Sequence, residues 1–309
     1  MLGSITYNWS GLFHTARRDC EAAAFEFVGT TFFLLFGLGG IQAAAGANSV
    51  GNESSGVERV LYISTCMGLS LLVSAWLFFR ATGGLFNPNV SLALFLVGSL
   101  KPLRFVLYCI AQLVGAIAAS AIILSLTSAE LSVNTFLQKG TNRAQGVFIE
   151  MFITAALVMT VLMLAAEVHE ARPFAPIGIG LMLFACHLFA VYYTGAAMNT
   201  ARAFGPAVVS GFPVPNHWVY WLGPFLGSLL GTAIYATFKY FHYWELNPGQ
   251  TDTHPENSPP PPSKSSPRPN IGGNTLPPKE PTSRKENGGM EKIDDQQIDQ
   301  RGRSDDSPV

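Results

Sequence analysis

The sequence predicts an all-α membrane protein in which six transmembrane helices and two re-entrant half-helices form two inverted repeats. Composition is the first reason: 49% of the 309 residues are hydrophobic, 13% are charged and the mean hydropathy is +0.28. Soluble domains rarely show this balance, whereas proteins that cross the bilayer several times commonly do. An internal repeat is the second reason, because residues 82–90 closely resemble residues 194–202, which lie 112 positions later.

Six apolar segments are each long enough to cross a bilayer, which requires about 20 residues. They comprise residues 22–45, 57–79, 102–126, 146–166, 173–194 and 217–241. An even number of crossings places both termini on one side of the membrane. Basic residues favour the cytoplasm for that side: the inner flanks then hold Arg17, Arg18, Arg80, Lys101, Arg104, Arg172 and Lys239, against Arg59, Lys139 and Arg143 outside. We expect an integral multi-pass protein of the plasma membrane.

Two further apolar segments, residues 86–98 and 198–210, are too short to span the bilayer and suit re-entrant half-helices. The non-helical backbone that leads into them is tolerated at membrane depth only where it is packed in protein or lines a water-filled cavity. The sequence therefore already predicts a pore.

The repeat shows how the segments are organised. At a constant offset of 112, the matching pairs include Gly68 with Gly180, Thr82 with Thr194, Asn87 with Asn199, and Gly115 with Gly227. Each unit contains three crossings, an odd number, so the second unit is inverted relative to the first. Inverted repeats with broken helices that meet near the midplane are typical of transport proteins.

The chain divides into a cytoplasmic N-terminal segment (1–20), a channel domain (21–245) and a tail (246–309). The first repeat covers about residues 21–126 and the second about residues 146–241. Beyond residue 246 lie 12 of the 20 prolines, and no Phe, Trp or Tyr follows Trp244. Such a segment cannot bury enough apolar surface to order itself, so we predict a disordered cytoplasmic tail. Phosphorylation of Ser304 in this tail is a regulatory hypothesis.

Small residues recur where helices are expected to touch. Ala111, Gly115 and Ala119 in the third span match Gly223, Gly227 and Gly231 in the sixth. A small residue at every fourth position lets helix backbones approach closely. Close helix packing is therefore predicted for both the third and the sixth span.

Each half-helix is expected to begin at an asparagine, Asn87 or Asn199, a residue type that commonly caps helix N-termini. A single capping asparagine has no further meaning. Two of them in inverted units bring two partly positive helix N-termini face to face, each with an amide NH2 donor. The prediction is a paired donor site at the pore centre.

These motifs resemble the aquaporins of the major intrinsic protein family, which carry two Asn-Pro-Ala boxes on half-helices. Here the boxes read Asn87-Pro88-Asn89 and Asn199-Thr200-Ala201. Thr200 is permissible at a first helical position, where the backbone amide has no intrahelical partner. Asn89 adds bulk and a second amide next to the pore centre. Further matches occur at residues 26–30, 111–116, 216–218 and 221–225, so the resemblance covers about residues 20–242.

The resemblance implies a four-residue constriction formed by Met67, His187, Ala196 and Arg202. Arg202 pairs with Val90 in the repeat, and His187 pairs with Ala75, so the second unit has two polar groups that the first lacks. A histidine at this place is similar to water-selective members, whereas flexible Met67 departs from the usual aromatic residue. The alternatives are a structural role for Arg202 in binding carbonyl groups and a core role for His187.

Glu26 and Glu150 lie in predicted spans, where an ionised carboxylate is costly. A proton relay is one interpretation. Their symmetric placement and the family pattern favour structural carboxylates that accept backbone amides of the half-helix loops, with Gln112 as buried support.

Other features indicate no cofactor. Cys20, Cys66, Cys109 and Cys186 occur singly without CxxC spacing, so neither a disulfide nor a metal site is predicted. The net charge of −1 gives no reason to expect a nucleic-acid partner. Asn52 begins a glycosylation sequon in the first outer loop.

The leading functional hypothesis is a passive channel that moves water in single file and excludes protons and ions. The alternative is a facilitator of small uncharged solutes such as glycerol or hydrogen peroxide. A coupled transporter is disfavoured because no unmatched midplane Asp/Lys pair is present, and an enzyme because no nucleophile and base are paired. The expected partners are water, the lipid bilayer and, by resemblance, three further copies in a homotetramer.

Overall fold

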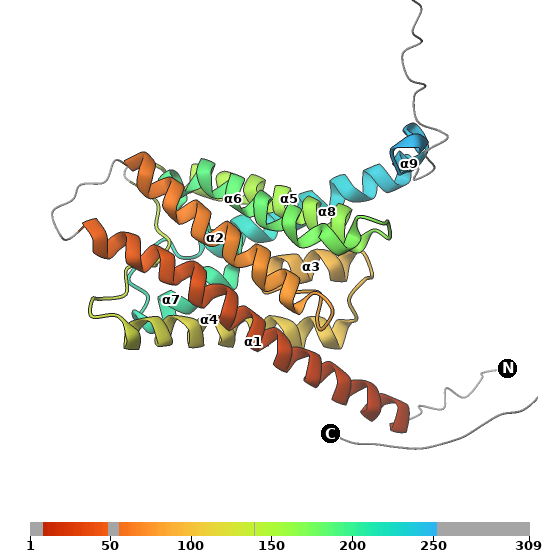
Figure 1. The fold of residues 1–309 in the computed structure, drawn as a ribbon, viewed down its shortest axis with the longest axis horizontal. Coiled ribbons are helices and arrows are strands. Elements are labelled where there is room, and N and C mark those ends of the chain that lie inside the picture. The colour runs from red at the N-terminus through yellow and green to blue at the C-terminus, as the bar shows by residue number, and fades with distance from the viewer. Residues whose placement is uncertain (1–8, 49–55, 139, 252–309) are drawn as a thin grey trace, which may run out of the picture. The chain divides into compact units, whose positions relative to one another are not determined.

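A computed structural model describes residues 9–48, 56–138 and 140–251. All of them belong to one compact unit, Met1–Asn257 (Figure 1). Asn52, Ser304 and most of the predicted tail lie outside the described residues. The sequence predicted the tail to begin at residue 246, and short helical turns, α9 (Tyr243–Leu246) and η3 (Pro248–Thr251), continue slightly past that point.

Six helices in the described part of the chain are long and apolar enough to cross a membrane, as predicted. They are α1 (Trp9–Asn48), α2 (Gly56–Phe78), α4 (Pro102–Leu126), α5 (Arg143–Val161), α6 (Ala175–Thr194) and α8 (Val219–Tyr240). The described residues form no β-strand. The first residues of α1 and the last residues of α8 lie on the same side of the bundle (Figure 1), which agrees with an even number of crossings.

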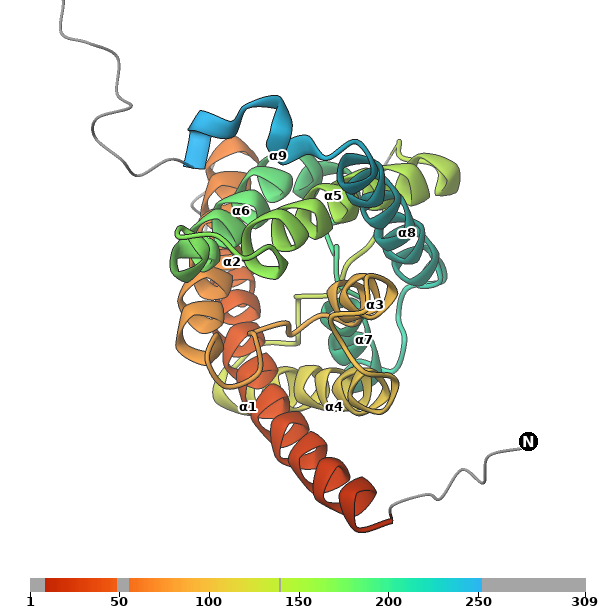
Figure 2. The ribbon, with the colours of Figure 1, turned by 90° about the vertical axis from the view of Figure 1, so that its right-hand side faces the viewer.

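The two half-helices are α3 (Pro88–Leu96) and α7 (Thr200–Val209). Each begins directly after its capping asparagine: Asn87 accepts the amide of Asn89, and Asn199 accepts those of Ala201 and Arg202. From the middle of the bundle the two half-helices extend towards opposite ends (Figure 1). Figure 2 shows both inside the ring of the six long helices.

The helix pairs reproduce the repeat. The helix α1 packs against α4, and its repeat equivalent α5 packs against α8, the equivalent of α4. The equivalent helices α2 and α6 pack against each other. At that contact, a Cβ atom added to Gly68 would lie 3.0 Å from the carbonyl oxygen of Gly180. The small side chains therefore let the two repeats meet backbone to backbone.

The ladder of small residues has the predicted role. A Cβ atom at Gly115 would lie 2.9 Å from the carbonyl oxygen of Phe27 on α1, and one at Gly227 only 2.5 Å from that of Met151 on α5. Cβ atoms do not approach other atoms so closely, so these positions require glycine. Close packing of α4 on α1 and of α8 on α5 is thereby confirmed.

The start of α1 differs from the sequence-based range, whereas the fourth span ends at residue 166 as predicted but in a different helical form. The helix α1 begins well before residue 22, and Asp19 near this end forms an ion pair with Arg104 of α4, with 2.6 Å between the carboxylate and guanidinium atoms. The helix α5 continues as a π-helical turn, Leu162–Ala166 (η1). Apolar length alone indicated neither the extension of α1 nor the π-helical turn.

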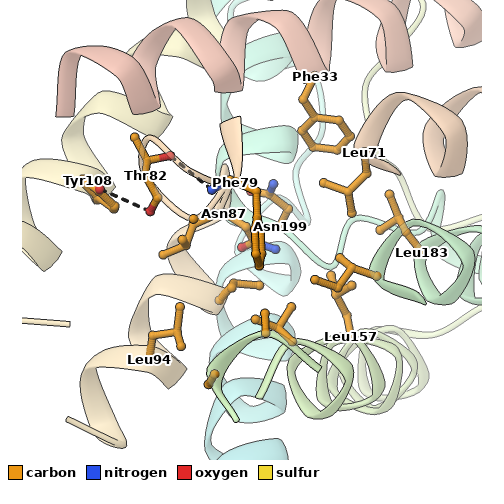
Figure 3. Close-up of a pocket in the computed structure, with 18 of the residues that line it drawn as sticks. Phe33, Leu71, Phe79, Thr82, Asn87, Leu94, Tyr108, Leu157, Leu183 and Asn199 are labelled. Carbon is orange, nitrogen blue, oxygen red and sulfur yellow. Dashed lines mark hydrogen bonds between the residues drawn. The ribbon is translucent and has the colours of Figure 1, made fainter. Parts of the chain in front are cut away.

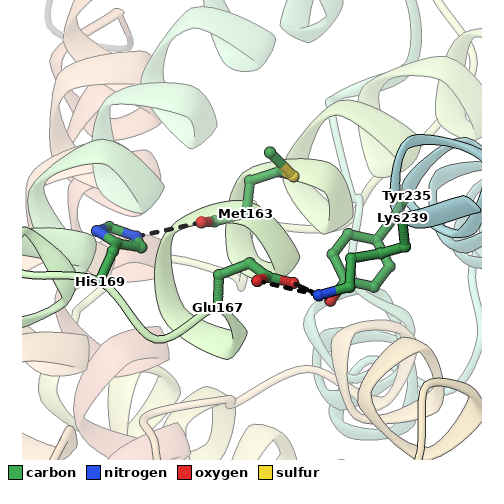
Figure 4. A network of polar contacts seen from close by, with 5 residues as sticks. All are labelled: Met163, Glu167, His169, Tyr235 and Lys239. Carbon is green, nitrogen blue, oxygen red and sulfur yellow. Dashed lines mark hydrogen bonds and ion pairs between the residues drawn. The ribbon is translucent and has the colours of Figure 1, made fainter. Parts of the chain in front are cut away.

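A polar network holds the end of η1 against α8 (Figure 4). Glu167 lies 3.0 Å from the ammonium of Lys239 and accepts a hydrogen bond from the hydroxyl of Tyr235. Burial acts to raise the pKa of Glu167, but the hydrogen bonds from Tyr235 and Lys239 and the charge of Lys239 outweigh it and hold the pKa below its usual value. His169 contacts the carbonyl oxygen of Met163 at 3.3 Å and so closes the turn.

Candidate functional site

A cavity of about 260 Å³ lies inside the bundle and reaches the place where the half-helices meet (Figure 3). Arg104, near the start of α4, and Arg172, in the helical turn before α6, are among the residues that line it. Its walls are largely apolar and include Phe33, Leu71, Phe79, Leu94, Leu157 and Leu183. Asn87 and Asn199 also belong to the lining, so the predicted donor pair faces this space.

The asparagines bind each other's loops. The Nδ2 atom of Asn87 donates to the carbonyl oxygen of Met198 at 2.8 Å, and Nδ2 of Asn199 donates to that of Phe86, also at 2.8 Å. Phe86 and Met198 are equivalent in the repeat, and both have a φ of 51°. This left-handed conformation is unfavourable for non-glycine residues and persists only where surrounding contacts impose it. One hydrogen of each NH2 group remains for a molecule in the cavity.

Asn89 does not belong to the cavity lining, although the sequence led us to expect its bulk next to the pore centre. Its Oδ1 atom accepts the backbone amide of Thr200 at 3.0 Å and the hydroxyl of Thr200 at 2.9 Å. The side chain is thus directed at the opposite half-helix. The direction of a side chain depends on its partner, which no local sequence pattern indicates.

The four residues of the expected constriction are almost completely buried: Met67, His187 and Ala196 are 0% exposed and Arg202 is 2% exposed. Met67 and Arg202 contribute to the cavity lining, whereas His187 and Ala196 do not. Arg202 Nη1 donates to the carbonyl oxygen of Val133 at 2.9 Å, so the guanidinium does bind a carbonyl group, as one alternative supposed. Val133 was not identified from the sequence, because it acts through its backbone from an irregular loop.

Two polar atoms near the constriction have no hydrogen-bond partner among the described residues. They are Nε of Arg202 and Nε2 of His187, both buried. The other ring nitrogen of His187, Nδ1, lies 2.9 Å from the carbonyl oxygen of Leu183. Buried polar atoms rarely lack a partner, so both atoms indicate a place where water or another polar molecule binds.

The carboxylates hold the loops that precede the half-helices. Glu150 accepts the hydroxyl of Thr194 at 2.6 Å and the amides of Ala197 and Met198 at 3.0 and 2.9 Å. Glu26 accepts the amide of Phe86.

Polar side chains support the first carboxylate and both loops. Gln112 donates to Glu26 and to the hydroxyl of Ser91, both at 2.9 Å. Two tyrosines that are equivalent in the repeat bind equivalent threonine carbonyl oxygens: Tyr220 binds that of Thr194 at 2.8 Å, and Tyr108 that of Thr82 at 3.4 Å. The two tyrosines are separated by the repeat offset of 112, but the sequence does not indicate what they bind.

The described part of the chain shows no cluster of side chains suited to bind a metal ion. Its His, Cys, Asp and Glu side chains form no group of three that could hold a metal ion, and all four cysteines are free thiols.

The profile of the family described as "Major intrinsic protein" matches residues 15–235, most of the described chain. The chain belongs to the major intrinsic protein family. A member of this family is a channel rather than an enzyme, and with its six membrane-spanning helices this one is an integral multi-pass membrane protein.

Named relatives agree with the assignment to the major intrinsic proteins. An aquaporin of Laccaria bicolor is 71% identical over 252 residues, which cover 81% of each chain. Aquaporin-1 of Laccaria bicolor is 70% identical over the same length and coverage. The structure of an aquaglyceroporin from Plasmodium falciparum matches 75% of this chain and 98% of its own with a TM-score of 0.61, and at 18% identity that likeness shows the fold alone.

Proposed function

We propose that this major intrinsic protein is a passive water channel in which Asn87 and Asn199 form the donor pair at the pore centre. The observation that carries the proposal is the largely apolar cavity that both amide groups line. Apolar walls offer water few competing partners, so a single file of molecules is oriented mainly at the two amides. A water molecule that accepts from both directs its hydrogens away from the junction, which interrupts proton transfer along the file.

Electrostatics support the exclusion of cations. Two helix N-termini, each with a partial positive charge, meet at the pore centre, and Arg202 adds a full charge on the outer side. We assign Met67, His187, Ala196 and Arg202 to the outer constriction. There Nε of Arg202 and Nε2 of His187 serve passing water, while Glu26 and Glu150 act as structural supports of the loops.

The alternative cargo is a small uncharged solute such as hydrogen peroxide or glycerol. Met67 favours this alternative to a degree, because an unbranched thioether side chain adapts its shape more readily than an aromatic ring. His187 opposes the passage of glycerol, since it narrows the pore and presents polar atoms to a carbon chain.

Proteoliposomes distinguish the two cargoes. Stopped-flow light scattering should show water flux well above that of empty vesicles, with little glycerol uptake. His187→Gly removes the ring without adding charge and should raise glycerol uptake while water flux persists. Water flux equal to that of empty vesicles would refute the proposal, and glycerol uptake by the unchanged protein would favour the alternative.

We propose further that the protein assembles as a homotetramer in the plasma membrane with both termini in the cytoplasm. Exposed aromatic residues on α5 and α6, among them Phe148, Phe152 and Tyr192, offer an apolar face for a neighbouring copy. Lipid covers such a face equally well, so native mass spectrometry in mild detergent decides between them. A tag at either terminus should be accessible only after the plasma membrane is permeabilised.

A further inference from the structure

We propose that Asn89 and Thr200 form a coupled pair across the two half-helices, in which Asn89 supplies the acceptor that the first turn of α7 needs and thereby positions Asn199. The effect on transport rests on the proposed function, whereas the coupling itself does not.

The two half-helices begin with different numbers of backbone donors. In α3 the first helical residue is Pro88, which has no N–H group, so the cap of Asn87 leaves no amide at that position unpaired. In α7 the first residue is Thr200, which keeps its N–H group. Oδ1 of Asn199 accepts from Ala201 at 2.9 Å and from Arg202 at 3.2 Å, and its bonds do not include the amide of Thr200.

The missing acceptor comes from the opposite half-helix. Oδ1 of Asn89 lies 3.0 Å from the amide nitrogen of Thr200 and 2.9 Å from its hydroxyl oxygen. Both residues are buried, with 5% of Asn89 and 4% of Thr200 exposed. Water therefore cannot easily replace Asn89, and the amide of Thr200 depends on it.

Both partners are also tied to α8. The backbone carbonyl oxygen of Asn89 accepts the hydroxyl of Ser228 at 2.9 Å, and the hydroxyl of Thr200 lies 3.2 Å from the carbonyl oxygen of Tyr220. The hydroxyl of Thr200 has only one hydrogen for its two acceptors, so its backbone amide makes the firmer link to Asn89. The pair thus fixes the start of α7 with respect to α3 and α8 together.

The consequence for the pore is positional. Thr200 directly follows Asn199, whose amide faces the cavity, and precedes Arg202 by less than one turn. Asn89 does not itself line the cavity. It is a positioning residue, which sets where the Asn199 donor and the Arg202 charge lie without touching a permeating molecule.

The chemistry predicts that removing either the acceptor or the donors alone is unfavourable. Asn89→Ala leaves the amide of Thr200 without an acceptor, and Thr200→Pro leaves the Asn89 carbonyl without both donors. The combination of the two changes removes donor and acceptor together and gives α7 the proline start that α3 already has. Thr200→Ser keeps the amide and the hydroxyl and serves as the conservative variant.

The test is a double-mutant cycle on the full-length protein. Melting temperature in detergent and water permeability per reconstituted channel are measured for the unchanged protein, Asn89→Ala, Thr200→Pro, the double variant and Thr200→Ser. Each of the first two single variants should melt earlier, because a buried donor or acceptor loses its partner, and should conduct less water per channel. The double variant should lie closer to the unchanged protein in melting temperature and water permeability than either of these single variants does. Thr200→Ser should resemble the unchanged protein in both.

Proton leak separates positioning from general destabilisation. Misfolding lowers the number of active channels and leaves the ratio of water to proton flux unchanged, whereas a displaced Asn199 lowers that ratio in Asn89→Ala. Additive losses of melting temperature in the double variant would overturn the proposal, as would an Asn89→Ala variant that melts and conducts like the unchanged protein. A double variant that fails to fold although both single variants fold would also overturn it. If the unchanged protein conducts no water, the proposed function fails, and the melting temperatures still decide whether the pair is coupled.

Discussion

At the scale of single residues, the carboxylates of Glu26 and Glu150 bind their loops unequally. Glu150 uses both oxygens, one for Thr194 and Ala197 and the other for Met198. Glu26 uses only Oε1, and its Oε2 atom has no partner among the described residues. The loop before α7 therefore depends more on its carboxylate than the loop before α3 does.

We predict that Glu150→Gln destabilises the protein more than Glu26→Gln. A glutamine has one acceptor oxygen, so at least one donor near residue 150 faces an NH2 group instead, at a cost of about 1.5–3 kcal/mol. Glu26→Gln keeps the one oxygen that is used. Thermal melting in detergent measures the stability of both variants. Equal decreases in melting temperature would contradict the argument.

For single residues, the sequence predicted which residues lie together better than it predicted which hydrogen bonds they form. The repeat pointed to Asn87 and Asn199 as equivalent, and the structure joins their loops by two hydrogen bonds of equal length. The repeat did not indicate the direction of Asn89 or the contact of Arg202 with Val133, because a motif does not say which partner each of its side chains binds.

At the scale of elements, the contact between α5 and α8 depends on backbone approach at Gly227. A methyl group there would lie 2.5 Å from the carbonyl oxygen of Met151, so Gly227→Ala must push the helices apart. Overpacking of this kind costs about 1–3 kcal/mol. Gly39→Ala on α1 is the matched control, because nothing lies within 4 Å of the added atom and alanine favours helix.

The measurement is again the melting temperature, together with water flux per channel. Gly227→Ala should lower both, and Gly39→Ala should leave both unchanged or melt slightly later. If the two variants behave alike, close packing of α8 on α5 is not what stabilises this half of the bundle.

The link between η1 and α8 predicts a pH dependence. The pKa of Glu167 lies below its ordinary value of 4.5 in the folded protein, so its stabilising effect is complete above that value and is lost as the pH falls through the folded pKa. With its side chain 17% exposed and that of Lys239 40% exposed, the pair contributes about 1 kcal/mol or less.

Glu167→Gln should therefore lower the melting temperature by a constant amount between about pH 5 and 7, and by less below the ordinary carboxylate pKa. Glu170→Gln, a change in the same loop at an exposed residue, should have no effect at any pH. A difference between Glu167→Gln and the unchanged protein that grows on acidification would contradict the assigned direction of the pKa shift.

The elements themselves follow closely from hydrophobic length. All six predicted spans and both half-helices are present, and the half-helices begin next to the asparagines that were expected to cap them. The extension of α1 towards the N-terminus and the π-helical turn after α5 were not predicted. An ion pair accompanies each of them, Asp19 with Arg104 and Glu167 with Lys239, and apolar length alone indicates neither pairing.

At the scale of the whole molecule, the repeat implies symmetry but does not say which faces touch. An odd number of crossings per unit required inversion, and the equivalent pairs α1 with α4 and α5 with α8 agree with it. That α2 and α6 meet at Gly68 and Gly180 follows from packing alone. Both glycines were already visible as a matched pair, but the repeat alone does not say that they touch.

The pore components all lie in the compact unit Met1–Asn257, so we predict that residues 258–309 are dispensable for conduction. Their deletion should leave water permeability per channel and melting temperature unchanged, because the cavity, both half-helices and their carboxylates remain. Deletion from residue 243 onwards is the contrasting variant: it removes Trp244, whose ring lies 5.0 Å from the ammonium of Lys239, and should lower the melting temperature modestly. Reduced permeability per channel in the shorter deletion would show that the C-terminal segment acts on the pore itself.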